Sequence, residues 1–230
     1  MIRKTCLVIG ATRGIGAAVA QRFSQEAYLT AGTHRGAGDV ADGIIPIEMD
    51  LRHDSSIVAG FAAALEALGG IDVLVVASGI TKDGLLLRAS EEDVNEIFRV
   101  NAIGPVLATK AALKIMLRQR AGSIVILSSM SVRYGVAGQT TYTATKGAIE
   151  AFSKSFAREY AGRGIRMNVV APGATDTQMV AAMTAEDRSA MMAGVPLGRL
   201  ATPLEIADAV FHTAQNTYMS GSVVSVSGGA

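Results

Sequence analysis

The sequence predicts a doubly wound α/β fold, in which a seven-stranded parallel sheet is covered by helices on both faces. Two observations lead to this prediction: seven short apolar runs alternate with longer segments of helical period, and the runs are almost continuously apolar. Strands buried on both faces have this continuous apolarity, and the alternation with helices is typical of parallel sheets. The expected strands are Thr5–Ile9, Leu29–Thr33, Ile45–Met49, Val73–Ala77, Ser123–Leu127, Met167–Ala171 and Ser222–Val226.

Helical periodicity lies between these runs. Residues Ala17–Gln25 place their apolar side chains along one side. A long helix is expected over Glu91–Leu117, because Ser90 can cap its first turn and Asp93 occupies the third helical position. The segment Thr143–Tyr160 again has core-like apolar spacing. Ligands of such sheets bind at the carboxyl ends of the strands, and most motifs below follow a strand.

Composition excludes several classes of function. Half of the 230 residues are hydrophobic, 18% are charged and the net charge is +1. An ordered globular protein is therefore expected, without the field that binds nucleic acid or an anionic membrane. The single cysteine, Cys6, cannot form an internal disulfide. The apolar stretch Cys6–Ala11 behind Arg3 and Lys4 is too short for a signal peptide or a membrane span, so a cytoplasmic protein is expected. No metal site is expected.

A glycine-rich turn, residues 10–16, follows the first expected strand and leads into the first helix. Its glycines, Gly10, Gly14 and Gly16, allow positive φ and the close approach of a ligand. Free N–H groups at the start of a helix attract an anionic pyrophosphate. The glycine spacing departs from the G-x-G-x-x-G pattern of dinucleotide-binding turns, so an ordinary βα turn remains an alternative.

Arg35 follows the second expected strand, where an acidic residue normally binds the ribose 2′-hydroxyl of NAD. No Asp or Glu occurs between Ala27 and Gly38. Arg35 and Arg13 could instead pair with the 2′-phosphate of NADP, or both could be solvated surface residues. Asp50, which ends the third strand region, could contact an adenine amino group or cap a helix.

Tyr142 and Lys146 lie four residues apart and therefore on one face of a helix. A free phenol, with a pKa of about 10, is a poor acid at neutral pH, and a neighbouring ammonium group would lower that pKa. Ser129, just after the fifth strand, could donate a hydrogen bond to a substrate carbonyl oxygen. A Tyr-x-x-x-Lys pair is also common on solvated helices, and the glycine turn together with Ser129 favours the catalytic interpretation.

The sequence resembles the short-chain dehydrogenase/reductase family over essentially its whole length. The resemblance implies a single Rossmann-type NADP-binding domain over residues 1–230. It is carried, in order, by GATRGIG at 10–16, Asp50-Leu51, VASG at 76–79, Asn101 in VNAIG, Ser129, YTATK at 142–146 and PGATDT at 172–177.

The resemblance implies a catalytic set of four residues. Tyr142 is the expected acid/base, and Lys146 is expected to bind the nicotinamide ribose and to lower the tyrosine pKa. Ser129 is expected to polarise the substrate carbonyl. The main chain of Asn101 is expected to hold a water molecule in the proton relay.

NADPH is the implied cofactor, and most of its expected contacts come from loops that follow strands. Two departures from the family pattern remove hydrogen bonds that brace the site: residues 76–79 read Val-Ala-Ser-Gly in place of Asn-Asn-Ala-Gly, and Ile9 replaces a threonine. We expect weaker bracing with the chemistry intact. The expected cofactor-binding residues are Gly10, Thr12, Arg13, Gly14, Ile15, Gly16, Arg35, Asp50, Leu51, Ala77, Gly79, Tyr142, Lys146, Pro172, Gly173, Thr175 and Thr177.

Within the family the sequence is most similar to β-ketoacyl thioester reductases, through residues 72–94, 195–210 and 218–229. THRG, after the second strand, resembles a reductase of long-chain mycobacterial-type elongation. The implied activity is NADPH-dependent reduction of a 3-oxoacyl thioester, carried by acyl carrier protein or coenzyme A, in fatty-acid or polyketide-type synthesis. Arg120 and Arg163 match the arginines that hold acyl carrier protein in that subgroup, and both are expected near the active-site entrance.

The resemblance also implies a homotetramer, built on helices around 91–117 and 142–160 and on the strand 222–227. A lid over an acyl chain is expected from Asp176–Leu197, although its four methionines (Met179, Met183, Met191 and Met192) could equally be ordinary helix core. Two other functions remain open. The chain could reduce another ketone or oxidise another alcohol, or it could be a catalytically silent subunit of a heteromeric reductase.

Overall fold

Seven parallel strands form one sheet in the computed structural model, which describes residues 3–36, 39–181 and 184–230. Their order across the sheet is β3-β2-β1-β4-β5-β6-β7. Each strand lies within two residues of its predicted bounds, so the α/β prediction with a parallel sheet is confirmed. The strands are β1 (Thr5–Ile9), β2 (Leu29–His34), β3 (Ile45–Glu48), β4 (Val73–Val76), β5 (Gly122–Leu127), β6 (Ile165–Pro172) and β7 (Val223–Val226).

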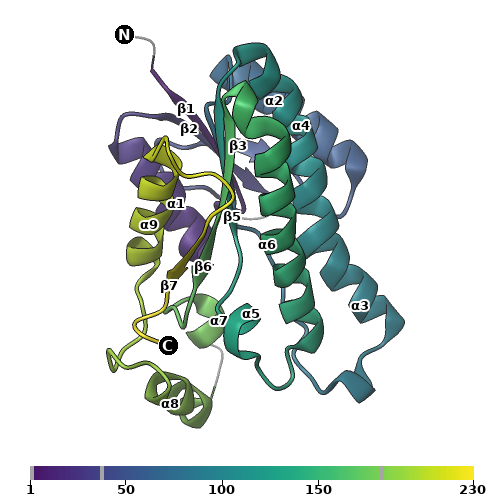
Figure 1. Cartoon of the computed structure of the whole chain (residues 1–230), viewed down its shortest axis with the longest axis vertical. Coiled ribbons are helices and arrows are strands. Elements are labelled where there is room, and N and C mark those ends of the chain that lie inside the picture. Colours follow the sequence, from purple (N-terminus) through teal and green to yellow (C-terminus); the bar gives the residue numbers. More distant parts are fainter. Residues whose placement is uncertain (1–2, 37–38, 182–183) are drawn as a thin grey trace.

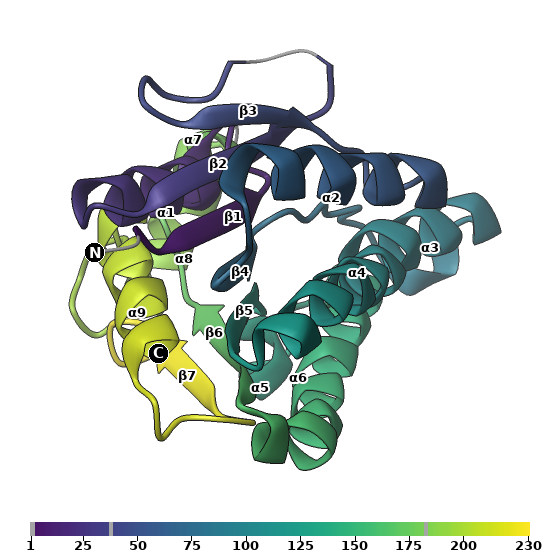
Figure 2. The ribbon, with the colours of Figure 1, turned by 90° about the horizontal axis from the view of Figure 1, so that it is seen from above.

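Helices cover both faces of the sheet (Figures 1 and 2). Successive side chains of a strand point to opposite faces, so Leu7 and Ile9 of β1 join one core while Cys6 and Val8 join the other. Both cores are almost fully apolar, which explains the continuous hydrophobic runs in the sequence. Helices α1 (Gly14–Gln25) and α9 (Pro203–Gln215) cover one face, and α2 (Asp54–Leu68), α4 (Gly104–Gln119) and α6 (Thr140–Tyr160) cover the other.

The long helix predicted over Glu91–Leu117 is interrupted. Helix α3 (Glu91–Phe98) and α4 are joined by a π-helical turn, Arg99–Ile103. Ser90 caps α3 as expected, because its hydroxyl accepts the Asp93 N–H at 3.1 Å. The combined segment Glu91–Gln119 is long and apolar enough to cross a membrane. However, half of its apolar 18-residue stretch is buried inside the fold, as in a core helix of a soluble protein.

Several elements lie outside the predicted set. They are α2, α9, and three short helices, α5 (Ser131–Tyr134), α7 (Gln178–Ala181) and α8 (Ala185–Ala193), the last two lying in the expected lid. Of the lid methionines, Met191 and Met192 are half-buried, Met183 lies outside the described residues, and the side chain of Met179 is likewise not described.

The strand order reverses direction between β1 and β4. The chain runs outward from β1 to β3 and then returns, through α2, to place β4 on the other side of β1. Loops after β1 and β4 therefore separate from one another at their carboxyl ends, which is where open α/β sheets bind ligands. The glycine turn follows β1 and residues 77–79 follow β4.

Candidate active site

The turn after β1 has no room for side chains at two of its glycines. Gly10 has φ of +88°, and a Cβ there would lie 2.4 Å from the hydroxyl oxygen of Ser78. A Cβ on Gly16 would lie 1.9 Å from the carbonyl oxygen of Gly10. Both contacts are far below van der Waals distance, so the turn requires glycine for close packing of α1 on the sheet.

Thr33, on β2, braces this turn from the neighbouring strand. Its hydroxyl accepts the Gly10 N–H at 3.0 Å, and its carbonyl oxygen accepts the Ala11 N–H at 3.1 Å. On the other side, the Ala77 N–H donates to the Ile9 carbonyl oxygen at 2.9 Å. A threonine on the adjacent strand thus holds Gly10, although the position before Gly10 is Ile9.

Arg13 and Arg35 are both exposed. Arg13 is the N-cap residue of α1 and makes no side-chain capping bond, so the first N–H groups of α1 have no side-chain partner there. Arg35 directly follows β2. Within the described ranges, neither guanidinium group forms an ion pair. Both are therefore able to bind an anion.

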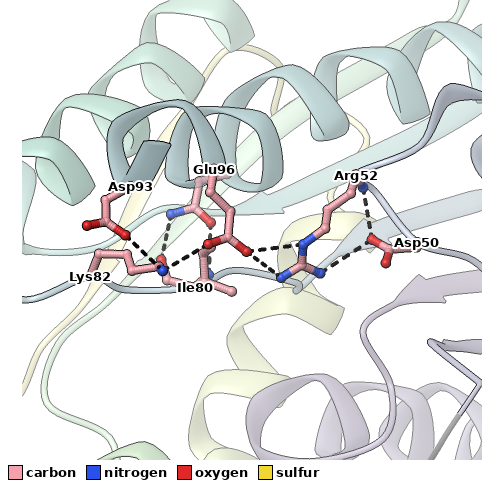
Figure 3. Close-up of polar contacts among 7 residues, drawn as sticks. Asp50, Arg52, Ile80, Lys82, Asp93 and Glu96 are labelled. Carbon is pink, nitrogen blue, oxygen red and sulfur yellow. Dashed lines mark hydrogen bonds and ion pairs between the residues drawn. The ribbon is translucent and has the colours of Figure 1, made fainter. Parts of the chain in front are cut away.

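Asp50, after β3, belongs to a chain of ion pairs (Figure 3). Its carboxylate accepts the Arg52 N–H at 2.9 Å and lies 3.5 Å from the Arg52 guanidinium. Arg52 also pairs with Glu96 at 2.8 Å, and Glu96 pairs with Lys82 at 2.9 Å. The network joins the loop after β3 to α3 and to the loop after β4. It fixes Asp50 in a local turn.

Ser129, Tyr142 and Lys146 come together at the carboxyl end of β5. Ser129 lies between β5 and α5, while Tyr142 and Lys146 occupy the first turns of α6. The Ser129 hydroxyl accepts the Ser131 N–H at 3.2 Å, and it is close enough to Tyr142 to lower the pKa of that phenol. The Lys146 ammonium donates to the Leu127 carbonyl oxygen at 2.9 Å and lies 5.7 Å from the centre of the Tyr142 ring. The structure therefore brings the three predicted side chains into one cluster.

Burial controls the protonation of this cluster. It raises the pKa of Tyr142 above its ordinary value of 10.0, a hydrogen bond from Ser129 lowers that pKa, and the Asp83 charge raises it. It also lowers the pKa of Lys146 from 10.5 to about 8. The expected lowering of the Tyr142 pKa by Lys146 is not seen, because burial favours the neutral form of both groups. Tyr142 thus carries its proton at neutral pH, as a proton donor must.

Asn101 lies in the π-helical turn and is 1% exposed. Its side chain holds the backbone of Ile80: the amide donates to the Ile80 carbonyl oxygen at 2.8 Å, and its oxygen accepts the Ile80 N–H at 2.9 Å. The amide also lies 3.3 Å from the Thr145 hydroxyl. A Cβ on Gly79 would lie 3.4 Å from both Asn101 Oδ1 and Lys146 Nζ. Asn101 therefore links the loop after β4 to the catalytic helix.

The segment after β6 closes the other side of the site. The Pro172 carbonyl oxygen accepts the Met130 N–H at 2.9 Å, which ties this segment to the loop that bears Ser129. The Thr175 hydroxyl donates to the Gly173 carbonyl oxygen at 3.0 Å. A Cβ on Gly14 would lie 3.5 Å from Thr177, so Thr177 borders the phosphate-binding turn.

Arg120 and Arg163 lie at the amino ends of the strands, on the side of the sheet opposite to Ser129 and Tyr142. Arg120 ends α4 before β5, and Arg163 lies in a short turn before β6. Both therefore lie at the amino ends of these strands, whereas Ser129 follows the carboxyl end of β5 and Pro172 ends β6. Six to eight residues of strand separate the two edges, a distance of about 20–25 Å. The expectation that both arginines flank the entrance of their own active site is wrong. Both are exposed.

Two carboxylates outside the predicted set lie beside the catalytic residues. Asp83 accepts hydrogen bonds from the Gln139 side chain at 3.2 and 3.3 Å, and its charge raises the pKa of Tyr142. Glu150 is buried on α6. Its spacing, four residues after Lys146, is a sequence signal for the same helix face. Asp83 has no such signal, because its place depends on a contact between two loops.

Known proteins match this chain over nearly its full length. The family model described as short chain dehydrogenase matches residues 4–188. The 3-oxoacyl-(acyl-carrier-protein) reductase MabA of Mycobacterium avium is 35% identical, with 99% of this chain and 90% of that protein covered. The FabG reductase of the same name from Vibrio cholerae is 38% identical, over 98% of this chain and 96% of that protein. The human 3-oxoacyl-(acyl-carrier-protein) reductase is 36% identical, over 98% and 97%. The chain therefore belongs to the short-chain dehydrogenase family.

Proposed function

We propose that this chain is an NADPH-dependent reductase of 3-oxoacyl thioesters, which it converts to 3-hydroxyacyl thioesters in fatty-acid or polyketide-type synthesis. The observation that carries the proposal is the cluster of Ser129, Tyr142 and Lys146 at the carboxyl edge of the sheet, beside a phosphate-binding turn. Relatives named 3-oxoacyl-(acyl-carrier-protein) reductase, aligned over at least 98% of the chain, support the substrate class.

The residues present fit a nicotinamide dinucleotide. Gly10 and Gly16 leave a cradle that a Cβ would fill, and the first turn of α1 has no side-chain cap. Thr175, Thr177 and Lys146 would hold the nicotinamide end, and Asp50, which follows β3, would contact the adenine. When bound, the nicotinamide supplies hydride to the substrate carbonyl carbon. The guanidinium groups of Arg13 and Arg35 are exposed and form no ion pair with the residues that the structure describes, which favours the 2′-phosphate of NADPH.

The chain's own residues supply the proton and position the carbonyl. The Ser129 hydroxyl donates a hydrogen bond to the carbonyl oxygen, which polarises it and stabilises the charge that develops there. The Tyr142 hydroxyl gives its proton to the same oxygen, where negative charge develops during the reaction. The Asn101 side chain anchors the Ile80 loop. Its main chain, in the π-helical turn, would hold the water molecule through which a proton returns to Tyr142.

Exposed apolar side chains on the loops after β4 and α5 support an apolar substrate. The loops after β4 and α5 are joined by a hydrogen bond from the Gly84 N–H to the Gly138 carbonyl oxygen at 2.9 Å. Next to this contact, Leu86, Leu87 and Val136 expose large apolar side chains. Exposed apolar side chains grouped in this way favour an apolar ligand over a sugar.

Assembly and carrier belong to the same proposal. β7 is an edge strand with one neighbour, β6, and its open edge can pair across a twofold axis in a homotetramer. Arg120 and Arg163 are candidates for docking an acidic acyl carrier protein. From the opposite edge of the sheet they would serve the active site of an adjacent subunit. The protein is proposed to work in the cytoplasm.

Oxidation of NADPH in the presence of acetoacetyl thioesters tests this function. We expect turnover with both the coenzyme A and the acyl-carrier-protein substrate, and little turnover with steroids, sugars or simple secondary alcohols. Efficient turnover of one of those alternatives alone would replace the thioester with that substrate. The same assay without turnover of any ketone, in a chain that binds NADPH, would indicate a silent subunit. Light scattering should give four times the mass of one chain, and a monomer would refute the tetramer.

A further inference from the structure

Three consecutive residues at the end of β5 are fastened to three successive turns of α6. The Leu127 carbonyl oxygen accepts from the Lys146 ammonium at 2.9 Å, and Ser129 is close enough to Tyr142 to lower its pKa. Between them, the Ser128 hydroxyl donates to Glu150 Oε1 at 2.9 Å. The three partners on α6 are spaced by four residues and share one helix face. Glu150 is therefore the third member of the face that carries the catalytic pair.

Glu150 is buried more deeply than an ordinary helix carboxylate. It is 5% exposed, and Ser128, its hydrogen-bond donor, is 4% exposed. Its second oxygen lies 3.4 Å from the Arg133 guanidinium, which comes from α5 and is half exposed. The Ser128 hydroxyl also lies 3.4 Å from the Lys146 carbonyl oxygen. Glu150 thus contacts both segments that flank Ser129: Ser128 on one side and the α5 turn on the other.

Burying a carboxylate is unfavourable unless hydrogen bonds and an opposite charge compensate it, and an apolar residue would fill such a place at lower cost. A chain that keeps Glu150 here gains a directional contact that an apolar residue cannot provide. The contact fixes the Ser128 side chain toward α6. Because Ser128 and Ser129 are adjacent, this also fixes the direction in which the Ser129 hydroxyl leaves the backbone.

We propose that Glu150 is a positioning residue: it holds the turn from Ser128 to Arg133 against α6, so that the Ser129 hydroxyl stays aligned with Tyr142. This inference rests on the proposed reductase function, because alignment of Ser129 matters only for a reaction at a carbonyl. Glu150 acts through Ser129 and does not touch the substrate. Its loss should therefore lower kcat far more than the affinity for NADPH, because Glu150 does not contact the glycine turn, Thr175 or Thr177, which are proposed to hold most of the cofactor.

A double-mutant cycle tests this assignment in the full-length protein. Glu150→Ala is combined with Ser129→Ala, and kcat, the KM for thioester and the Kd for NADPH are measured. We expect Glu150→Ala alone to lower kcat about tenfold or more, the effect of a misaligned reacting group. In the Ser129→Ala background the same change should lower kcat less than about twofold, because the hydroxyl that Glu150 positions has already been removed. Glu159→Ala, an exposed carboxylate on the same helix, is the matched control and should leave kcat unchanged.

Two further variants keep the test decisive if Glu150→Ala does not fold. Glu150→Gln retains an acceptor for the Ser128 hydroxyl and should keep kcat within about threefold of the wild type; Ser128→Ala should lose about as much as Glu150→Ala. Equal losses from Glu150→Ala with and without Ser129, or an unchanged kcat in Ser128→Ala, would overturn the proposal. Wild-type turnover in the same assay reports separately on the reductase function.

Discussion

Lys146→Met should stabilise the folded protein at neutral pH while abolishing its activity. Burial lowers the pKa of Lys146 from 10.5 to about 8. That difference corresponds to about 3 kcal/mol by which folding disfavours the ammonium form. The variant also loses the hydrogen bond to the Leu127 carbonyl oxygen. This loss lowers the expected gain in stability by about 1 kcal/mol. We therefore expect the free energy of unfolding at pH 7 to rise by about 1–3 kcal/mol.

The pH dependence has a definite sign. The pKa of Lys146 in the folded chain lies below its value in the unfolded chain, so the folded state binds fewer protons between about pH 8 and 10.5. The free energy of unfolding of the wild type should therefore contain a contribution that rises with pH across this window. Below about pH 8 the folded chain bears the full free-energy cost of burying the Lys146 ammonium group. Lys146→Met should lack this contribution.

Urea unfolding at fixed protein concentration, at neutral pH and at about pH 9, measures both effects. Lys154→Met, an exposed lysine on the same helix, is the matched control and should leave stability unchanged within about 0.5 kcal/mol. A Lys146→Met variant that is less stable than the wild type at neutral pH, with the same pH dependence, would refute the burial argument.

Three other changes test the cofactor and carrier sites. Arg35→Ala should raise the KM for NADPH about tenfold with little change for NADH, as expected for a lost charge-assisted contact; equal effects on both cofactors would make Arg35 structural. Gly16→Ala should weaken NADPH binding and lower stability by about 1–3 kcal/mol, because its methyl would meet the Gly10 carbonyl oxygen; calorimetry that finds unchanged binding would contradict the packing argument. Arg120→Glu with Arg163→Glu should slow reduction of the carrier-protein substrate at low salt and spare a small ketoester; no change with either substrate would favour coenzyme A.

The five inner strands, β1, β2, β4, β5 and β6, were predicted well because they are mostly buried and read as continuous apolar runs. The two outer strands, β3 and β7, are only partly buried, and their sequences are still apolar enough to be recognised. The interruption of the long helix could not be predicted from periodicity. It depends on Gly104, where a Cβ would lie 2.8 Å from Leu51 Cβ, and on the Asn101 side chain, which holds the Ile80 backbone. Both are tertiary contacts that helical periodicity does not record.

The site was predicted as far as its residues follow strands or share a helix face. Ser129, Tyr142 and Lys146 meet both conditions, and the structure joins them. Arg120 and Arg163 were placed by resemblance, and the direction of β5 and β6 puts them at the wrong edge for their own active site. The opposing effects of burial on Tyr142 and Lys146 could not be read from spacing, because desolvation depends on the folded environment.

Single-turnover reduction of an acetoacetyl thioester by NADPH, with wild-type protein and with Tyr142→Phe, tests the central claim most directly. The account predicts rapid NADPH oxidation by the wild type. In Tyr142→Phe it predicts a rate lower by about two or more orders of magnitude, the effect of a lost general acid, with NADPH still bound. Near-normal reduction by Tyr142→Phe would contradict the assignment of Tyr142 as the proton donor.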